Sequence, residues 1–206
     1  MTSAFAVGFD LDMTLVDSRA GIAATYRALT RRTGVWVDAD VAVTRLGPPL
    51  RDELARWFPA ETVDDAVRSY RALYPTYAIA PCGALPGAHE ALESVRARGG
   101  RVIVVTSKLG GLARLHLDHL KLVADEVAGE LFAEGKAAAL TEFGAGVYVG
   151  DHIADMLAAR TAGVPGVGVT TGPCQRSSLV AAGAAEVLDD LRGFPAALDR
   201  LLRLAW

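Results

Sequence analysis

The sequence is poor in cysteine and has no long apolar run. Its 206 residues include two cysteines, Cys82 and Cys174, without a CxxC pattern, so neither a disulfide framework nor a zinc site follows. No apolar stretch approaches the roughly 18 residues of a membrane-spanning helix, so no membrane partner is expected. The N-terminal segment lacks a basic region and reaches acids at Asp10 and Asp12, unlike a signal peptide. A reducing cytoplasm is the expected compartment.

The chain also lacks an excess of basic charge and the common nucleotide-binding motifs. With 21 basic and 24 acidic residues, its net charge is −3, which disfavours a dedicated nucleic-acid binder. No GxGxxG follows the first apolar run, and the segment 129–136 has the wrong spacing for a P-loop. Lysine is scarce, at three residues against 18 arginines, so the positions of the lysines draw interest. No oligomeric state follows from these features.

What is present is an alternation of short apolar runs with segments of helical spacing. At about 150 residues a domain, the length fits one domain carrying an insert. The alternation predicts an α/β fold, a Rossmann-like parallel sheet core with helices on both faces. Near-continuous apolar runs suit strands that are covered on both sides. The expected strands are 4–9, 102–105, 147–149, 167–169 and 186–188, and the expected helices of this part are 109–120, 153–162 and 177–182.

One interval breaks the alternation. Between Asp17 and about Ala84 no convincing strand occurs, and 22–32, 50–58 and 63–77 are expected to be helices separated by Gly and Pro. The sequence therefore predicts a small all-helical cap, residues 18–80, inserted after the first strand. The core would consist of residues 1–17 and 81–206.

Two acidic pairs follow expected strands. Asp10 and Asp12 come directly after the first, and Asp151 and Asp155 follow the run at 147–149. In open α/β sheets, ligands bind outside the carboxyl ends of the strands, and carboxylate oxygens suit Mg²⁺. Either pair alone could instead be an acidic turn or a helix cap exposed to water.

Three further residues are candidates for binding an anion. Thr106 and Ser107 end another apolar run, where hydroxyl and backbone N–H groups at a helix start can hold a phosphate. Both could also simply cap the following helix. Lys136 lies before or at the start of a helix, where its charge opposes the helix dipole unless an anion is nearby.

Together these segments resemble the haloacid dehalogenase-like hydrolase superfamily. Its motif DxDx[TV] is matched by Asp10, Asp12 and Thr14, and its GDxxxD by Gly150, Asp151 and Asp155. Thr106 matches the Thr or Ser that closes an apolar strand, and Lys136 is the candidate for its lysine. The insert, with 46–51, is similar to the cap of the phosphoglycolate phosphatase-like branch. Met13 departs from the usual Gly of that branch, and its backbone is expected to avoid conformations open to glycine alone.

The resemblance implies a Mg²⁺-dependent phosphatase that acts on a small phosphorylated metabolite, a phosphoglycolate-like monoester. Asp10 would be the nucleophile, forming an aspartyl-phosphate, and Asp12 the general acid and base. Thr106, Ser107 and Lys136 would bind the transferred phosphoryl group. The metal ligands would be Asp10, the Asp12 backbone carbonyl, Asp151 and Asp155, the last either directly or through water.

Several alternatives stay open. A nucleotidase, an inorganic pyrophosphatase or a sugar phosphomutase of the same superfamily would keep both Asp10 and Asp12. A catalytically silent binding module on the same fold would be expected to lose one of them. Arg45, near the Gly47–Pro48 turn of the cap, is a candidate substrate contact, although an exposed arginine is common in a chain this rich in arginine.

Overall fold

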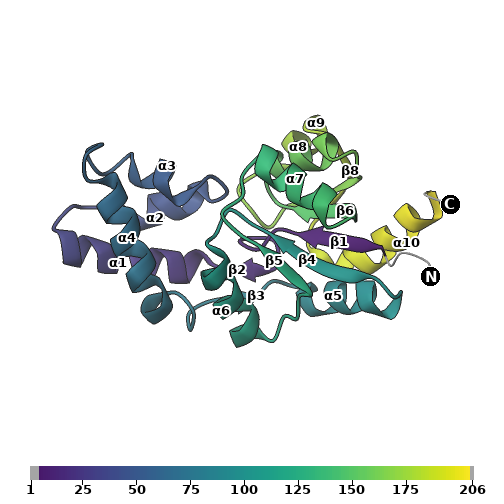
Figure 1. The fold of residues 1–206 in the computed structure, drawn as a ribbon, viewed down its shortest axis with the longest axis horizontal. Coiled ribbons are helices and arrows are strands. Elements are labelled where there is room, and N and C mark those ends of the chain that lie inside the picture. The colour runs from purple at the N-terminus through teal and green to yellow at the C-terminus, as the bar shows by residue number, and fades with distance from the viewer. Residues whose placement is uncertain (1–4, 205–206) are drawn as a thin grey trace.

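The computed structural model describes residues 5–204, and its centre is a six-stranded, entirely parallel sheet (Figure 1). The predicted α/β class is therefore confirmed. The order across the sheet is β5 (Glu126–Ala128), β4 (Arg101–Val105), β1 (Ala6–Phe9), β6 (Ala145–Gly150), β7 (Gly166–Val169) and β8 (Ala184–Leu188).

The position of β1 in the sheet decides where the site lies. It pairs with β4 on one side and with β6 on the other, with Phe9 level with both Val104 and Val149. The residue after β1, Asp10, continues this pairing, and its N–H donates to the Val149 carbonyl at 2.8 Å. Asp10 therefore lies at the carboxyl edge of the sheet, between the ends of its two neighbouring strands.

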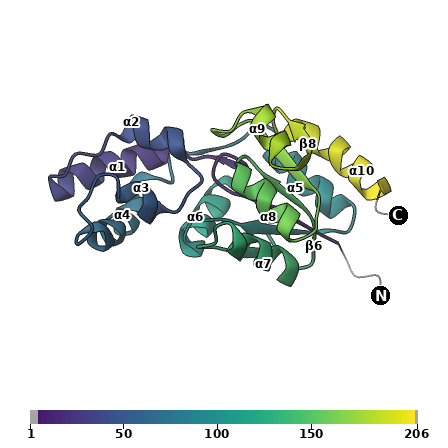
Figure 2. The ribbon, with the colours of Figure 1, turned by 90° about the horizontal axis from the view of Figure 1, so that it is seen from above.

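Helices cover both faces, as Figures 1 and 2 show. On one face, Val7 and Phe9 of β1 share an apolar core with the helices α5, α6 and α10. On the other face, Ala6 shares a core with α7 and α8. The bounds are α5 (Ala88–Ala97), α6 (Gly110–Leu120), α7 (Glu134–Glu142), α8 (Ile153–Thr161), α9 (Arg176–Ala181), η2 (Leu191–Gly193) and α10 (Phe194–Leu204).

A group of helices lies beside the carboxyl edge of the sheet, at the left of Figures 1 and 2. Its members are α1 (Arg19–Thr33), α2 (Ala39–Ala42), η1 (Val43–Arg45), α3 (Leu50–Leu54) and α4 (Val63–Tyr77). They pack around their own apolar cluster, which includes Ile22, Leu29, Leu54 and Tyr74. Apart from Leu112 of α6, the buried members of this cluster all lie within residues 18–80. We propose from this that residues 18–80 form the cap and that 1–17 and 81–206 form the core.

The chain passes between these two parts through a pair of very short strands. β2 (Val16–Asp17) leads into α1, and β3 (Gly83–Ala84) follows the last cap residues. The two are antiparallel neighbours, with Val16 opposite Ala84 and Asp17 opposite Gly83. The chain thus leaves and returns at one place.

The sequence-based elements differ from the observed ones in a few places. All five expected strands occur, although the first was expected from residue 4, which lies outside the described residues. β5 was not expected, and the helix expected over 50–58 ends at Leu54. None of the helices that the structure describes is long and apolar enough to cross a membrane.

Candidate active site

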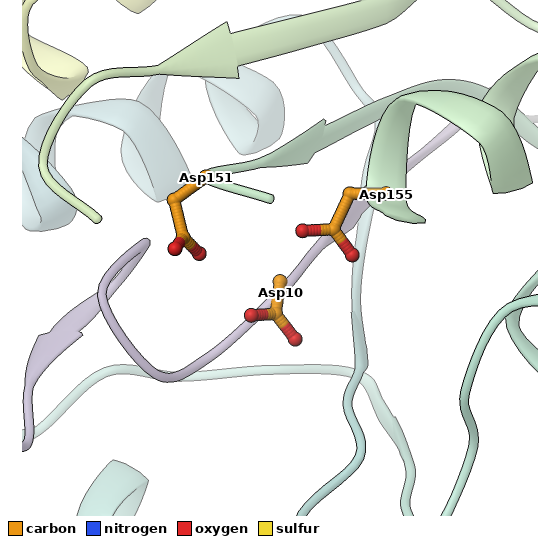
Figure 3. A group of neighbouring side chains, drawn as sticks. All are labelled: Asp10, Asp151 and Asp155. Atoms are coloured by element: carbon orange, nitrogen blue, oxygen red, sulfur yellow. The ribbon is translucent and has the colours of Figure 1, made fainter. Parts of the chain in front are cut away.

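Three buried carboxylates meet at the carboxyl edge of the sheet. Asp10 follows β1, Asp151 follows β6, and Asp155 lies in the first turn of α8. Each offers an oxygen within 4.8 Å of the others, and Figure 3 shows the three groups converging. Three of the four aspartates that the sequence pattern singled out therefore form one cluster. The fourth, Asp12, has its side chain in a separate ion pair.

Lys136 is the counter-charge of this cluster. It lies in the first turn of α7, is 3% exposed, and donates to Asp10 Oδ1 at 2.8 Å and to Asp155 Oδ1 at 2.7 Å. Burial works against its charged form, but the two carboxylates outweigh burial and raise the pKa of Lys136. The attraction of Lys136 to two buried carboxylates therefore offsets the unfavourable interaction of its charge with the helix dipole.

One ammonium does not balance three carboxylates, and the pKa values reflect this. Burial raises the pKa of Asp10 to about 7, although Lys136 acts in the opposite direction. Burial and the nearby Asp10 likewise raise the pKa of Asp151 well above its ordinary value. With all three ionised, the cluster and Lys136 together carry two excess negative charges in a place sheltered from water. Such a site favours a divalent cation.

Neighbouring groups fix the orientation of Asp155 and Asp151. The His152 N–H donates to Asp155 Oδ2 at 3.1 Å, and the Tyr148 hydroxyl lies 3.2 Å from Asp155 Oδ1. The Thr14 hydroxyl donates to Asp151 Oδ1 at 2.9 Å. A Cβ at Gly150 would collide with the Asp155 carboxylate, so the glycine before Asp151 makes room for it.

Met13, the departure from the family pattern, has a left-handed backbone with φ 61° and a buried side chain. This region costs an L-residue roughly 1–2 kcal/mol but is not closed to it, so the expectation that Met13 avoids glycine-only conformations agrees with its geometry. Its carbonyl accepts a hydrogen bond from the Thr171 hydroxyl at 2.5 Å. The loop therefore keeps a turn that glycine would adopt more easily.

Asp12 belongs to a second network that joins the core to the cap. Lys108 Nζ lies 2.9 Å from Asp12 Oδ2 and donates to the hydroxyl of Tyr74, on α4, at 2.7 Å. The Tyr74 oxygen is 2.9 Å from Nε2 of His116, on α6. Because an ammonium can only donate, the Tyr74 proton points to His116, which accepts it as a neutral ring.

The pKa values in this network follow from the same contacts. Burial alone would raise the pKa of Asp12, but the adjacent Lys108 ammonium outweighs it and holds the pKa below its ordinary value. Burial, together with Lys108, lowers the pKa of His116 to about 4. The sequence motifs give no signal for Tyr74, His116 or Tyr148.

The other candidate residues lie around the same edge. Thr106 follows β4 and is buried, and its hydroxyl accepts the Lys108 N–H at 3.2 Å. The Ser107 hydroxyl donates to the carbonyl of Gly47 in the cap at 3.1 Å. Arg45 pairs with Glu53 at 2.5 Å and lies over the Trp57 ring.

A cavity of about 440 Å³ lies between the cap and the core. Asp10 and Asp12 open into it, and Arg45, Ser107 and Lys108 are among its lining residues. Its volume falls in the range of small-molecule sites. Asp10, one member of the carboxylate cluster, thus borders a partly open cavity suited to a small ligand.

The fold and this site define a class: an α/β protein whose central strand ends in a buried carboxylate beside a prospective cation site, beneath a helical cap. The comparison with known families places the chain within that class. It belongs to the haloacid dehalogenase-like hydrolase family, whose sequence model matches residues 7–169. The resemblance inferred from the sequence motifs is thereby confirmed.

Several individual proteins are similar to this chain. The probable phosphatase IndB of Dickeya dadantii is 31% identical, over 96% of this chain and 94% of that protein. A phosphoglycolate phosphatase of Rhodospirillum rubrum is 32% identical, over 92% and 91%. A haloacid dehalogenase-like hydrolase from Streptococcus pneumoniae has a solved structure with a TM-score of 0.83, 25% identity, and coverage of 96% of this chain and 100% of that one.

Another relative is matched over only part of its length. The tyrosine-protein kinase PtkA of Mycobacterium tuberculosis is 35% identical over 112 residues, which is 54% of this chain and 38% of that protein. The alignment therefore leaves most of the kinase without a counterpart here.

Proposed function

We propose that this protein is a Mg²⁺-dependent phosphatase that hydrolyses a small phosphomonoester through an aspartyl-phosphate on Asp10. The observation that carries the proposal is the buried cluster of Asp10, Asp151 and Asp155, with a single compensating lysine at its edge. The family membership and the phosphatase names of full-length relatives support the same chemistry.

The donor set fits Mg²⁺. All its side-chain donors are carboxylate oxygens, and the two excess negative charges match one divalent cation. Asp10 and Asp151 would be direct ligands with the Asp12 backbone carbonyl, and Asp155 would bind directly or through water. Bound Mg²⁺ would neutralise charge so that an anionic carboxylate and an anionic phosphate can approach each other.

The chain's own residues would share the reaction as follows. An Asp10 oxygen attacks phosphorus while the ester P–O bond breaks, and Asp12 supplies a proton to the leaving oxygen. Asp12 then takes a proton from the water that cleaves the aspartyl-phosphate. Lys136, Thr106 and Ser107 would hold the phosphoryl oxygens as charge moves across them.

The Lys108 contact bears on the two halves of this cycle. Because Lys108 holds Asp12 as a carboxylate, Asp12 is set for the water step. Its role as an acid would require the Lys108 ammonium to move away, and an incoming anionic phosphate would draw it. Arg45 would contact the leaving group from the cap side of the cavity.

The decisive experiment measures phosphate release from a panel of monoesters with Mg²⁺ and with EDTA, for wild type and Asp10→Asn. Release should require Mg²⁺ and fall by about 10⁴-fold or more in Asp10→Asn, because the nucleophile is lost. Asp118→Asn, which changes an exposed aspartate of α6, is the matched control and should be fully active.

The alternatives correspond to distinct outcomes of the same panel. Preference for nucleoside monophosphates or for pyrophosphate would identify a nucleotidase or a pyrophosphatase, and transfer between sugar hydroxyls without release would identify a mutase. Folded wild type that releases nothing from any compound in Mg²⁺ would contradict the phosphatase proposal and favour a binding module.

A further inference from the structure

The volume and the lining of the cavity beside Asp10 and Asp12 indicate which kind of leaving group fits it. This inference rests on the proposed phosphatase function. Its lining is largely apolar and aromatic. Side chains from α1 and α4 of the cap face the core across it, together with residues near α6 and after β5. They include Ile22, Tyr26, Val67, Tyr70, Leu112 and Phe132.

A row of tyrosines leads from the cap toward the acid–base residue. The rings of Tyr26 and Tyr70 lie 4.8 Å apart, and those of Tyr70 and Tyr74 lie 5.6 Å apart. Tyr74 contacts Lys108, which pairs with Asp12. The three rings are buried, and they form an aromatic wall behind the cavity that reaches the group that would meet the leaving oxygen.

The cations that line the cavity are already engaged by acids that line it. Arg45 pairs with Glu53 at 2.5 Å, and that glutamate is only 11% exposed. The remaining pairs of this kind are Arg51 with Asp64 at 3.0 Å, Arg71 with Glu130 at 2.8 Å, and Lys108 with Asp12 at 2.9 Å.

Two consequences follow for the part of the substrate that departs. A carboxylate on the leaving group could pair with one of these cations only if the cation gave up its present acidic partner. The cavity therefore adds little binding free energy for a carboxylate. A two-carbon leaving group would leave most of the roughly 440 Å³ filled with water, whereas an aromatic ring would replace that water.

We propose that the preferred substrate is a phosphomonoester of an uncharged alcohol with an aromatic or bulky apolar group, rather than of a small hydroxy acid. The ring would pack against the apolar residues that line the cavity, among them Val67 of α4, Leu112 of α6 and Phe132. The phosphoryl group would lie at the carboxylate cluster.

The test compares three primary alkyl phosphates, so that the reacting oxygen is similar in each: benzyl phosphate, ethyl phosphate and phosphoglycolate. We expect kcat/KM for benzyl phosphate to exceed that for ethyl phosphate by at least about 10-fold, because a single methylene in a hydrophobic pocket is already worth about 10- to 200-fold. Phosphoglycolate should be no better than ethyl phosphate. Equal or better turnover of phosphoglycolate than of benzyl phosphate would overturn the inference and leave the phosphatase intact.

Two variants test separately the effect of the cavity volume and the effect of the ion pairs that line the cavity. Val67→Trp should fill the cavity and lower the benzyl-to-ethyl ratio of kcat/KM at least tenfold, whereas Arg68→Trp, next to it but exposed, should leave the ratio unchanged. Glu130→Gln frees Arg71 and should raise the phosphoglycolate-to-ethyl ratio several-fold. An unchanged benzyl-to-ethyl ratio in folded Val67→Trp would contradict the proposed position of the ring. Absence of release from all three esters in Mg²⁺ would overturn the phosphatase proposal together with this inference.

Discussion

Two of the three lysines in the chain end beside aspartates at the carboxyl edge of the sheet, Lys136 on Asp10 and Lys108 on Asp12. Both are nearly buried, whereas the arginines of the ion pairs are more exposed. A compact ammonium fits between closely spaced oxygens, where the larger planar guanidinium would need more room. Lysine therefore occurs in place of arginine at the two buried positions where the space between the oxygens is small.

His116 makes the stability of the folded chain depend on pH. Its pKa is about 4 in the folded state and about 6.5 when unfolded, so the unfolded state binds the proton more tightly. The contribution of the neutral His116 to the free energy of unfolding is therefore present above pH 6.5 and is lost as the pH falls toward 4. Between pH 7 and pH 5 this residue alone should cost about 2 kcal/mol.

Urea unfolding of wild type and His116→Gln at those two pH values measures this contribution. The loss of stability on acidification should be smaller by about that amount in His116→Gln. His119→Gln, which changes an exposed histidine of the same helix, serves as the control. Equal losses in wild type and His116→Gln would show that His116 is not kept neutral by the fold.

The sequence predicted those site residues that follow strands and missed those that tertiary structure brings in. Asp10, Asp151, Asp155 and Lys136 each come at a strand end or a helix start, where local pattern predicts a position at the edge of the sheet. Tyr74 and His116 lie within helices, 42 residues apart, and resemble ordinary core residues. Only the packing of α4 against α6 brings them together.

At the scale of elements, the strands found from the sequence are those with near-continuous apolar runs. β5 was missed because it has three residues, begins with Glu126 and lies at the edge of the sheet, where burial is partial. The helix expected over 50–58 ends at Leu54 although Phe58 is buried, because irregular turns carry the apolar side chain into the cap cluster. Burial of an apolar residue does not require that its helix continue.

Gly8 in β1 sets how closely α7 approaches the sheet. A Cβ there would lie 2.7 Å from the Leu140 side chain and 2.9 Å from the Tyr148 ring. We expect Gly8→Ala to lower the free energy of unfolding by about 1–3 kcal/mol, because the core must be overpacked. Gly146→Ala, in the adjacent strand β6, has only a carbonyl at 3.8 Å and should change stability by less than about 0.5 kcal/mol.

Denaturant unfolding of both variants tests this difference. A cost of Gly8→Ala equal to that of Gly146→Ala would mean that α7 can shift away from the sheet without loss. Because Lys136 lies on α7, such a shift would also loosen its contacts with Asp10 and Asp155.

At the scale of the whole molecule, the proposed Mg²⁺ site predicts that the cation stabilises the folded chain. At a concentration of 100 times its Kd, a ligand that binds only the folded state stabilises it by about 2.7 kcal/mol. For a chain of this size we expect Mg²⁺ to raise Tm by about 5–10 °C relative to EDTA.

Thermal unfolding of wild type and Asp151→Asn, each with Mg²⁺ and with EDTA, checks the coupling. The variant should lose most of the shift, and in EDTA its Tm should equal or exceed that of wild type, because one excess buried charge is gone. The same Mg²⁺ shift in both proteins would place the cation elsewhere.

The paired strands β2 and β3 have a consequence for how such a molecule can diversify. Val16 and Ala84 pair with each other, so the residues between them form an insert whose two ends are held together by β2 and β3. With respect to the six-stranded sheet, this insert is equivalent to a single loop. The entropic cost of closing a loop grows only slowly with its length, so inserts of very different size are nearly interchangeable at this point. An insert at this point can therefore be exchanged without changing the strands that carry Asp10 and Asp151.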